Sequence, residues 1–232
     1  VRDKIVADGL NDGGFDVTDC GQHVSAEEFN ALASQPDTVI VDMRNHYESE
    51  VGHFKGAVLP ASETFRDEIK EVESLLEEKR DENIVLYCTG GIRCEKASAY
   101  LKHKGFSNVH QLEGGIIEYV RQVRTQGLDN QFQGVNFVFD ERMAERVSDD
   151  VVAECHQCGT ACDHMTNCAN AACNVLMVQC PTCAEAMDST CGSTCKAFVA
   201  LPPEEQKAKR QGTRPERRTL RQPKKARVAK RL

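Results

Sequence analysis

The 232-residue chain has no tryptophan, only four tyrosines and no long apolar run. A helix that crosses a membrane needs about 20 consecutive apolar residues, so the sequence predicts no membrane span. The N-terminus also lacks the charged and apolar regions of a secretory signal. Because the first residue is Val1 rather than methionine, we expect an upstream domain to be missing from this chain.

Acidic and aromatic residues are scarce in the C-terminal segment. From Leu201 onward there are twelve Lys or Arg and three Asp or Glu, so this segment carries +9 and the rest carries −16. A basic segment without aromatic rings attracts phosphates but offers no surface for base stacking. We expect residues 204–232 to be a mostly disordered tail, after at most one or two helical turns, that is either merely solubilising or docks RNA. Its candidate RNA-binding residues are Arg217, Arg218, Lys224 and Lys225.

Before residue 130, strand and helix patterns alternate. Continuous apolar runs, typical of strands covered on both faces, occur at 38–41 and 84–87, and a third strand is expected at 109–112. Apolar residues at helical spacing or helix-start signals predict helices at 25–33, 65–79, 94–104 and 116–124. Alternation with short connections predicts the α/β class, with a parallel sheet flanked by helices.

A cysteine, Cys88, stands where the second of these strands ends. Ligands bind outside the carboxyl ends of strands in such sheets, and the following helix points its N-terminal amides at the loop. The backbone of Thr89, Gly90, Gly91 and Ile92 is therefore predicted to form an anion cradle, to which Arg93 adds a positive charge. These features lower the pKa of a thiol and favour the thiolate.

Residues around this loop resemble the rhodanese family. The loop has the rhodanese spacing C-x-x-G-x-R, one residue shorter than the C-x(5)-R of cysteine phosphatases. The motifs DMR, YE, GHFKGA and LEGG, at 42–44, 47–48, 52–57 and 112–115, follow the rhodanese order. The resemblance covers about residues 20–125 and implies a structural ion pair between Asp42 and Arg44 near the loop. It also implies that His53 is a hydrogen-bonding residue rather than a base.

Longer stretches resemble one family in particular, the bacterial tRNA uridine(34) hydroxylases. They include VRDKIVADGL, YCTGGIRCEKASAYL, NFVFDERM and CHQCG, and the resemblance covers nearly all of residues 1–203. It implies a cytoplasmic enzyme that acts on tRNA and oxidises carbon 5 of the wobble uracil, with dioxygen and an electron donor as co-substrates. Cys88 takes the place of the active-site cysteine, and the N-terminal ferredoxin-like domain of the family is absent here.

Cys94 follows the loop arginine directly. It either resolves an oxidised Cys88 as a disulfide or packs as a small helix residue. The catalytic candidates are therefore Cys88, Arg93 and Cys94. Two other functions stay open: a sulfurtransferase that carries a persulfide on Cys88, and a zinc-organised RNA-binding adaptor with an inert rhodanese fold.

Cysteine is scarce before residue 150, where three occur, and dense from Cys155 to Cys195, where nine occur. Two C-x-x-C pairs have the spacing of one tetrahedral zinc site: Cys155, Cys158, Cys180 and Cys183. A second zinc would take four of Cys162, Cys168, Cys173, Cys191 and Cys195. An iron–sulfur cluster is the alternative, and its visible absorption would distinguish it from colourless zinc.

These patterns predict four segments. They are a linker at 1–20, a rhodanese-like domain at 21–130, a zinc-binding cysteine-rich region at 131–203 and the basic disordered tail at 204–232. The cysteine-rich region has too few large apolar residues for its own core, so metal is expected to stabilise it.

Overall fold

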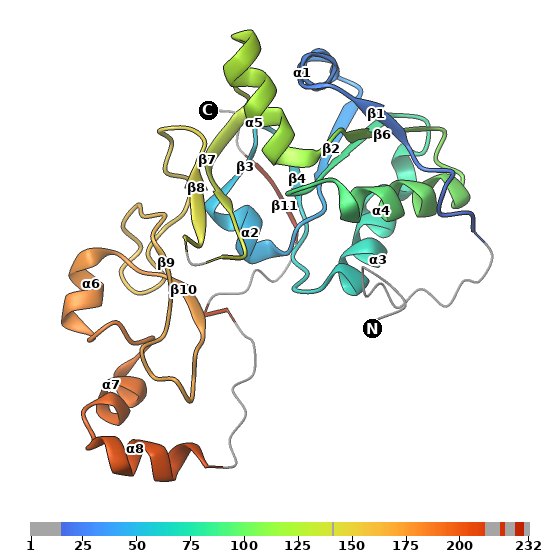
Figure 1. Ribbon diagram of the computed structural model, residues 1–232. Helices are drawn as coiled ribbons and strands as arrows, with labels where there is room; N and C mark the ends of the chain where they lie inside the picture. Colours follow the sequence, from blue (N-terminus) through green and yellow to red (C-terminus); the bar gives the residue numbers. More distant parts are fainter. Residues whose placement is uncertain (1–14, 141, 212–218, 221–225, 230–232) are drawn as a thin grey trace.

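The computed structural model describes residues 15–140, 142–211, 219–220 and 226–229 (Figure 1). Its largest sheet has the strand order β1-β6-β5-β2-β4-β11. The strands are β1 (Gln22–Val24), β2 (Thr38–Asp42), β4 (Val58–Leu59), β5 (Asn83–Tyr87), β6 (Asn108–Leu112) and β11 (Arg227–Val228). All neighbours pair in parallel except β11, which is antiparallel to β4. The three predicted strands are β2, β5 and β6.

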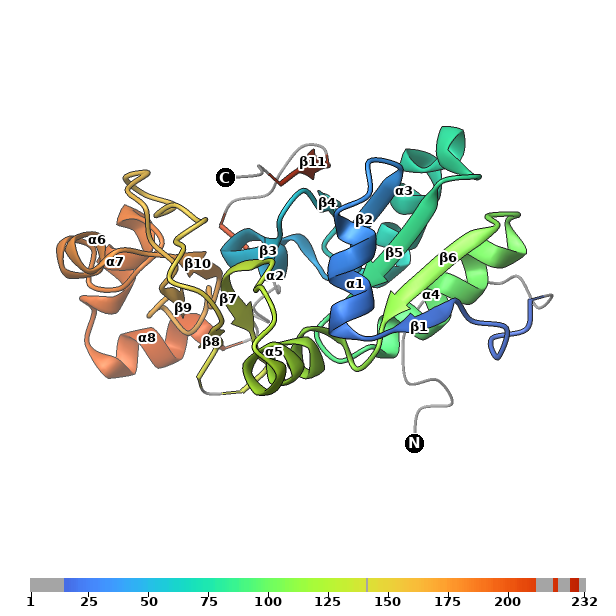
Figure 2. The same cartoon turned by 90° about the horizontal axis from the view of Figure 1, so that it is seen from above.

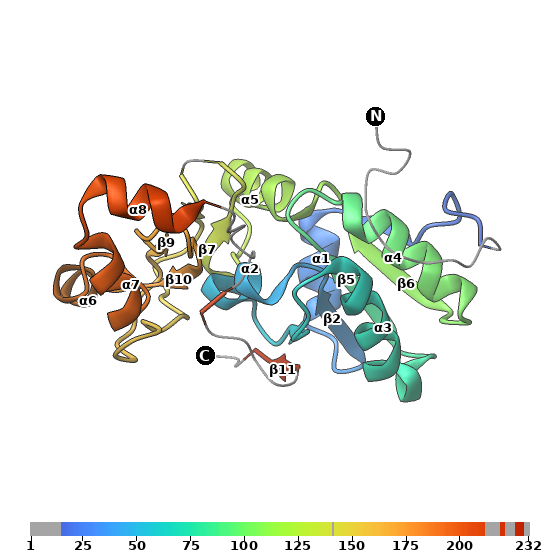
Figure 3. The same cartoon turned by 90° about the horizontal axis from the view of Figure 1, so that it is seen from below.

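Helices cover both faces of this sheet (Figures 2 and 3). On one face, α3 (Phe65–Leu75) and α4 (Ile92–His103) bury Ile69 and Leu101 against Val41 of β2. On the other face, α1 (Ala26–Ala33) and α5 (Gly115–Gln126) bury Phe29 and Tyr119 against Val85 of β5. Neighbouring residues of one strand therefore face opposite cores, which explains the uninterrupted apolar runs. The predicted α/β class is confirmed.

The start of α1 agrees with the prediction, whereas the end of α3 and the start of α4 differ from it. The side chain of Ser25 accepts from the Glu28 amide and Glu28 returns to the Ser25 amide, so α1 begins with the predicted capping box. The predicted helix at 65–79 is divided into α3 and a short 3₁₀ helix, η1 (Glu77–Lys79). Helix α4 begins at Ile92, two residues earlier than predicted, which brings its N-terminus closer to Cys88.

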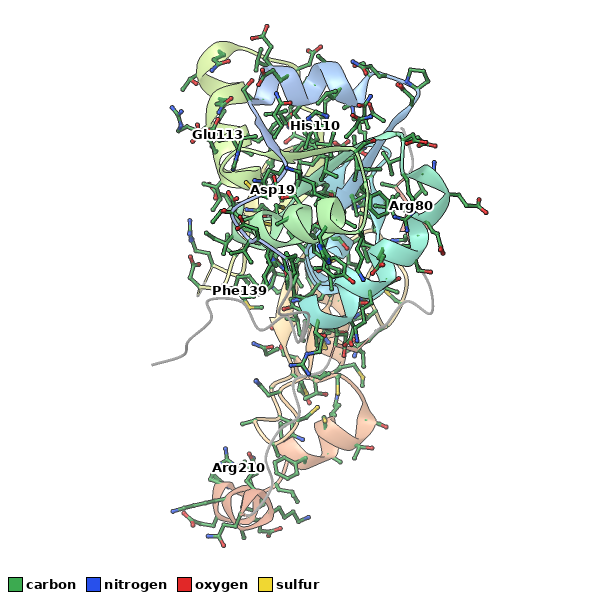
Figure 4. All side chains as sticks on the ribbon, turned by 90° about the vertical axis from the view of Figure 1, so that its right-hand side faces the viewer. Asp19, Arg80, His110, Glu113, Phe139 and Arg210 are labelled. Carbon is green, nitrogen blue, oxygen red and sulfur yellow. The ribbon has the colours of Figure 1, made fainter. Side chains whose placement is uncertain are left out.

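Several short elements had no sequence signal. Helix α2 (His46–Val51) leads into β3 (Gly52–Phe54), which pairs antiparallel with β7 (Phe132–Phe137); β7 also pairs with β8 (Ala144–Arg146). Strand β7 ends at Phe137, and the side chain of Phe139 is exposed (Figure 4).

The cysteine-rich part lies beside β7 and β8 (Figure 1). It contains the hairpin β9 (Met165–Asn167) and β10 (Leu176–Val178), then α6 (Pro181–Ala186) and α7 (Ser193–Val199). Its residues Met165 and Val178 pack against Val135 and Phe137 of β7, and only a small separate cluster forms around Cys168, Val175 and Cys195. Among the described residues, no helix is long and apolar enough to cross a bilayer.

The tail is more ordered than predicted where the structure describes it. Helix α8 (Pro203–Arg210) begins it, and β11 near its end pairs with β4, so that Arg227 faces Leu59. The amide of Ala229 also donates to the carbonyl of Ala57 at 2.8 Å. Strand β11 was not predicted, whereas the eight residues of α8 form about the one or two helical turns expected at the start of the tail. The four candidate RNA-binding residues Arg217, Arg218, Lys224 and Lys225 lie outside the described residues.

Candidate active site and metal centres

The loop after β5 wraps around the sulfur of Cys88. Gly91 has φ +89°, a conformation that favours glycine, and its amide donates to the Cys88 sulfur at 3.1 Å. The carbonyls of Cys88 and Thr89 accept from the first amides of α5, at 3.0 and 3.2 Å. Gly115 permits this contact, because a Cβ there would lie 2.4 Å from the Cys88 carbonyl oxygen. The LEGG motif thus fixes the loop from the neighbouring strand and helix.

The electrostatic environment of Cys88 favours the thiolate. A hydrogen bond from the Cys94 thiol lowers the pKa of Cys88 from its ordinary 9.0 to about 6, although burial acts in the opposite direction. The positive charge of Arg93 and the backbone N–H groups of Cys94 and Arg93 also lower this pKa. Burial, together with the hydrogen bond to Cys88, raises the pKa of Cys94 well above 9.0. At neutral pH the pair therefore consists of a thiolate and a thiol.

The guanidinium of Arg93 is held by Glu48, a partner that the sequence analysis missed. Two parallel hydrogen bonds of 2.8 Å join them, and the Glu48 side chain is fully buried. Glu48 also accepts from the amide of Asn45, which fixes it in the first turn of α2. Arg93 therefore influences Cys88 through its field, while its strongest contacts position the helix and loop.

Asp42 and Arg44 form the ion pair that the rhodanese resemblance implied. Their side chains are fully buried, with 2.7 Å between Arg44 Nη2 and Asp42 Oδ2. Arg44 also donates to the carbonyl of Gly52, and the Tyr87 hydroxyl donates to Asp42. The pair ties the end of β2 to the end of β5, directly before Cys88. His53, from β3, makes a 2.7 Å contact with the Ser49 carbonyl oxygen through Nδ1.

A cleft of about 680 Å³ opens beside the loop. Its lining residues come from β1, α4, the loop and the start of α5: His23, Gly90, Glu95, Glu113, Gly114, Ile117 and Glu118. Cys88 is only 1% exposed and lies beneath the loop rather than in this lining.

A second carboxyl group, Glu68 on α3, is fully buried near Arg93, and neither of its oxygens has a hydrogen-bond partner among the described residues. Burial raises its pKa well above 4.5. The folded chain thus retains a proton that the unfolded chain releases above pH 4.5, so this group lowers stability as the pH rises.

We expect Glu68→Gln to remove this pH dependence. The variant should match the parent near pH 4.5 and exceed its unfolding free energy at pH 8 by at least about 1 kcal/mol, the value of one pKa unit. Urea unfolding at both pH values measures the difference. The control is Glu78→Gln, since Glu78 is an exposed acid in η1, directly after α3. Its stability relative to the parent should be the same at both pH values. Equal stabilities of parent and Glu68→Gln at pH 8 would contradict the protonated state.

Eight cysteines gather into two groups of four. The first contains Cys155, Cys158, Cys180 and Cys183, and the second contains Cys168, Cys173, Cys191 and Cys195. Within each group all sulfurs lie within 4.8 Å of one another. Four sulfurs about 2.3 Å from one zinc ion lie about 3.8 Å apart, and three sulfur pairs here measure 3.6, 3.7 and 3.6 Å. Each group can therefore hold a metal ion.

Amide groups also point at these sulfurs. The amide of Cys180 donates to Cys155, and that of Cys191 donates to Cys168, both at 3.3 Å. Such donors stabilise thiolates around a metal ion. Cys162, one of the five candidates for the second group, belongs to neither. It is buried in the core beside β7 and accepts from the His164 amide instead.

Two families match the chain by their sequence profiles. The rhodanese-like domain family matches residues 25–122, and the family described as rhodanase C-terminal matches residues 133–196. A protein of Pectobacterium carotovorum is 57% identical over 212 residues, and one of Photorhabdus laumondii is 55% identical over the same length. Both are named tRNA uridine(34) hydroxylase. The chain is similar to both of these proteins over most of its own length.

Each match covers 91% of this chain but 60% of the relative. The chain thus spans about 60% of the length of these tRNA uridine(34) hydroxylases. Among solved structures, the rhodanese-like domain of an Anabaena protein is 21% identical, with a TM-score of 0.39, and covers 51% of this chain and 83% of that chain. The rhodanese-like profile over residues 25–122 and the strand order of the largest sheet together assign the rhodanese-like fold.

Proposed function

We propose that this chain is the catalytic part of a tRNA uridine(34) hydroxylase, which converts the wobble uridine of tRNA into 5-hydroxyuridine. The observation that carries the proposal is a sulfur with a pKa of about 6 in a glycine-rich loop, in a chain whose relatives bear this name over 91% of its length. A thiolate is the form of cysteine that attacks electrophilic carbon.

In the proposed reaction the Cys88 thiolate adds to carbon 6 of the uracil, which makes carbon 5 electron-rich. Carbon 5 then takes one oxygen atom of dioxygen, while the other leaves as water with two electrons from a donor and two protons. Loss of the carbon-5 proton and of the Cys88 sulfur restores the ring as 5-hydroxyuridine. The Gly91 amide and Arg93 stabilise the sulfur anion before attack and after its release.

Cys94 has two uses in this scheme. Its thiol donates to the Cys88 sulfur, so it supports the thiolate. If Cys88 is oxidised to a sulfenate, the same thiol can attack it, forming the Cys88–Cys94 disulfide and releasing water. A two-electron reductant then returns both thiols. Cys94 is fully buried, which protects the pair from other thiols.

The two groups of four cysteines are proposed to hold zinc. All cysteines of the described residues are unpaired by disulfides, and four sulfurs without other ligand atoms favour zinc or an iron–sulfur cluster. A structural zinc replaces the apolar core that this region lacks. Reduced thiols, clustered zinc sites and a tRNA substrate together favour the cytoplasm.

The test of the function is the nucleoside composition of tRNA. Mass spectrometry should detect 5-hydroxyuridine in tRNA from cells with the gene and none in tRNA from cells without it. The same result should follow from the full-length protein and unmodified tRNA with dioxygen and a reductant. Persistence of 5-hydroxyuridine in cells without the gene, in the absence of a second such enzyme, would refute the proposal.

A persulfide sulfurtransferase is the second candidate, because the rhodanese-like profile and the C-x-x-G-x-R loop both match. In that reaction the Cys88 thiolate takes the outer sulfur of thiosulfate and releases sulfite. A gain of about 32 Da on the Cys88 peptide after thiosulfate treatment, with transfer to cyanide, would favour it. If the chain is only a sulfurtransferase, the 5-hydroxyuridine content of tRNA should be the same in cells with and without the gene.

We propose that the basic tail attracts the tRNA backbone. Helix α8 carries Lys207, Lys209 and Arg210, and Arg210 lies at the opposite end of the molecule from Glu113 (Figure 4). The charges of Arg217 and Arg218 follow in sequence. Phosphate contacts of this kind position a nucleic acid without reading its sequence.

Arg217→Gln with Arg218→Gln is expected to weaken tRNA binding and to reduce the salt slope of log K by up to about 1.8, since each lost phosphate contact contributes ~0.7–0.9. Substitution is preferable to deletion of residues 204–232, which would also remove β11 from the sheet. The charge-matched control is Arg66→Gln with Lys70→Gln, two exposed residues of α3. Equal salt slopes for the two double variants would refute a specific contribution of the tail.

A further inference from the structure

Three side chains with metal-binding atoms converge outside the active-site loop and outside both cysteine groups. They are Cys20, just before β1, His23 within β1, and Glu95 in the first turn of α4. One ligand atom of each lies within 4.8 Å of the other two. A thiol, an imidazole and a carboxylate are the three ligand types that zinc and other first-row divalent ions accept in proteins.

A buried amide orients two of these ligands. Gln111 of β6 is 1% exposed and stands opposite His23 in the register of β1 with β6. Its amide nitrogen donates to Glu95 Oε2 at 3.1 Å and lies 2.8 Å from His23 Nε2. Ser98 donates to the Gln111 oxygen at 3.3 Å. Metal ligands are characteristically held by such outer hydrogen bonds.

The third ligand is positioned by the backbone beside it. The amide of Gly21 donates to Ser98 Oγ at 2.8 Å, so Cys20 is held against α4. No larger residue fits at this place, because a Cβ on Gly21 would lie 2.7 Å from the Val109 carbonyl oxygen. Ser98 and Gln111 thus form one buried polar chain that positions all three ligands.

The spacing of His23 Nε2 and Glu95 Oε1 suits two ligands of one ion. These atoms lie 2.7 Å apart, and two ligand atoms about 2.0–2.1 Å from one metal ion lie about 3 Å apart. The Gln111 amide nitrogen, 2.8 Å from His23 Nε2, donates to the other carboxylate oxygen, Glu95 Oε2, so Oε1 stays available to the ion.

We propose that Cys20, His23 and Glu95 form a third metal site, for a first-row divalent ion such as Zn²⁺, with at least one coordination position open to the cleft. His23 and Glu95 line that cleft together with Gly90 of the active-site loop. Three protein ligands leave a position for water or for an oxygen of a bound molecule, unlike the closed four-cysteine groups. The proposal stands whether or not the chain hydroxylates tRNA.

Cobalt added to the chain that holds two zinc ions, one in each group of four cysteines, tests the site, because Co²⁺ gives a sulfur-to-metal charge-transfer band when a cysteine binds it. The parent should bind one Co²⁺ per chain with this band and without releasing zinc. Cys20→Ser should lose the band, and both Cys20→Ser and His23→Ala should weaken Co²⁺ binding at least tenfold. Glu113→Gln removes a charge from the same cleft but no ligand, so it should bind Co²⁺ like the parent.

Cys88→Ser is the control for the other thiolate near the cleft, and it should keep the band. A parent without the band, or with the same band after Cys20→Ser, would overturn the proposal. Loss of the band in Cys88→Ser with its retention in Cys20→Ser would also overturn it, because the ion would then sit on the active-site sulfur. Since His23 is 43% exposed in its side chain, His23→Ala keeps the test valid if Cys20→Ser folds poorly.

Discussion

Replacing Cys88 by serine is expected to lower 5-hydroxyuridine formation by roughly 10³-fold or more, the scale on which loss of a nucleophile acts. Serine preserves the size of the side chain, but its hydroxyl stays protonated at neutral pH, where a thiol with a pKa of about 6 is ionised. Mass spectrometry of tRNA from cells that carry only the variant measures the effect. Full activity of Cys88→Ser would remove Cys88 from the mechanism.

Cys94→Ser is the informative companion to this experiment. A serine hydroxyl can still donate to the Cys88 sulfur, so activity should largely survive if Cys94 only supports the thiolate. If Cys94 instead forms a disulfide with Cys88 in each turnover, Cys94→Ser should be as inactive as Cys88→Ser. Alkylation of the Cys88 peptide followed against pH, with a midpoint near pH 6 in the parent, checks the thiolate separately.

Cys180→Ser is expected to remove one zinc ion per chain and to unfold the region around it. Cys180 is a member of the first group of four and is buried in the core beside β7 together with Cys155. A structural zinc site contributes on the order of 10 kcal/mol to the folding of a small domain, more than the whole stability of most domains. Metal analysis and limited proteolysis between β8 and α8 measure the two effects.

Cys162→Ser is the matched control, since Cys162 is buried in the same core but lies outside both groups. It should keep its zinc content and its resistance to protease. Unchanged zinc in Cys180→Ser would contradict the assignment of the first group. Visible absorption with stoichiometric iron in the purified parent would replace zinc by an iron–sulfur cluster.

The parts of the fold that could be predicted are those with long local patterns. Strands β2 and β5 are buried on both faces, so their apolar residues are continuous in the sequence. Helix α4 was recognisable, but its start at Ile92 depends on the left-handed conformation of Gly91, which periodicity does not reveal. Helix α2 has six residues, too few for a periodic signal, and so the partner of Arg93 on it, Glu48, was missed.

The candidate sites divide in the same way. The spacing of two C-x-x-C pairs is a local signal, whereas the members of the second group come from a β-hairpin and the start of α7 and could be selected only in three dimensions. Cys20 and Glu95 are 75 positions apart, and only the pairing of β1 with β6 brings them together. The burial of Glu68 was not predictable either, because a lone acid on an amphipathic helix usually faces water.

Strand β11 has a consequence for the solubility of the molecule. It occupies the outer side of β4, where the peptide groups of Val58 and Leu59 would otherwise face solvent. An open sheet edge is a template on which a second molecule can add a strand. A chain shortened before Arg227 would therefore be prone to self-association through the uncovered edge of β4.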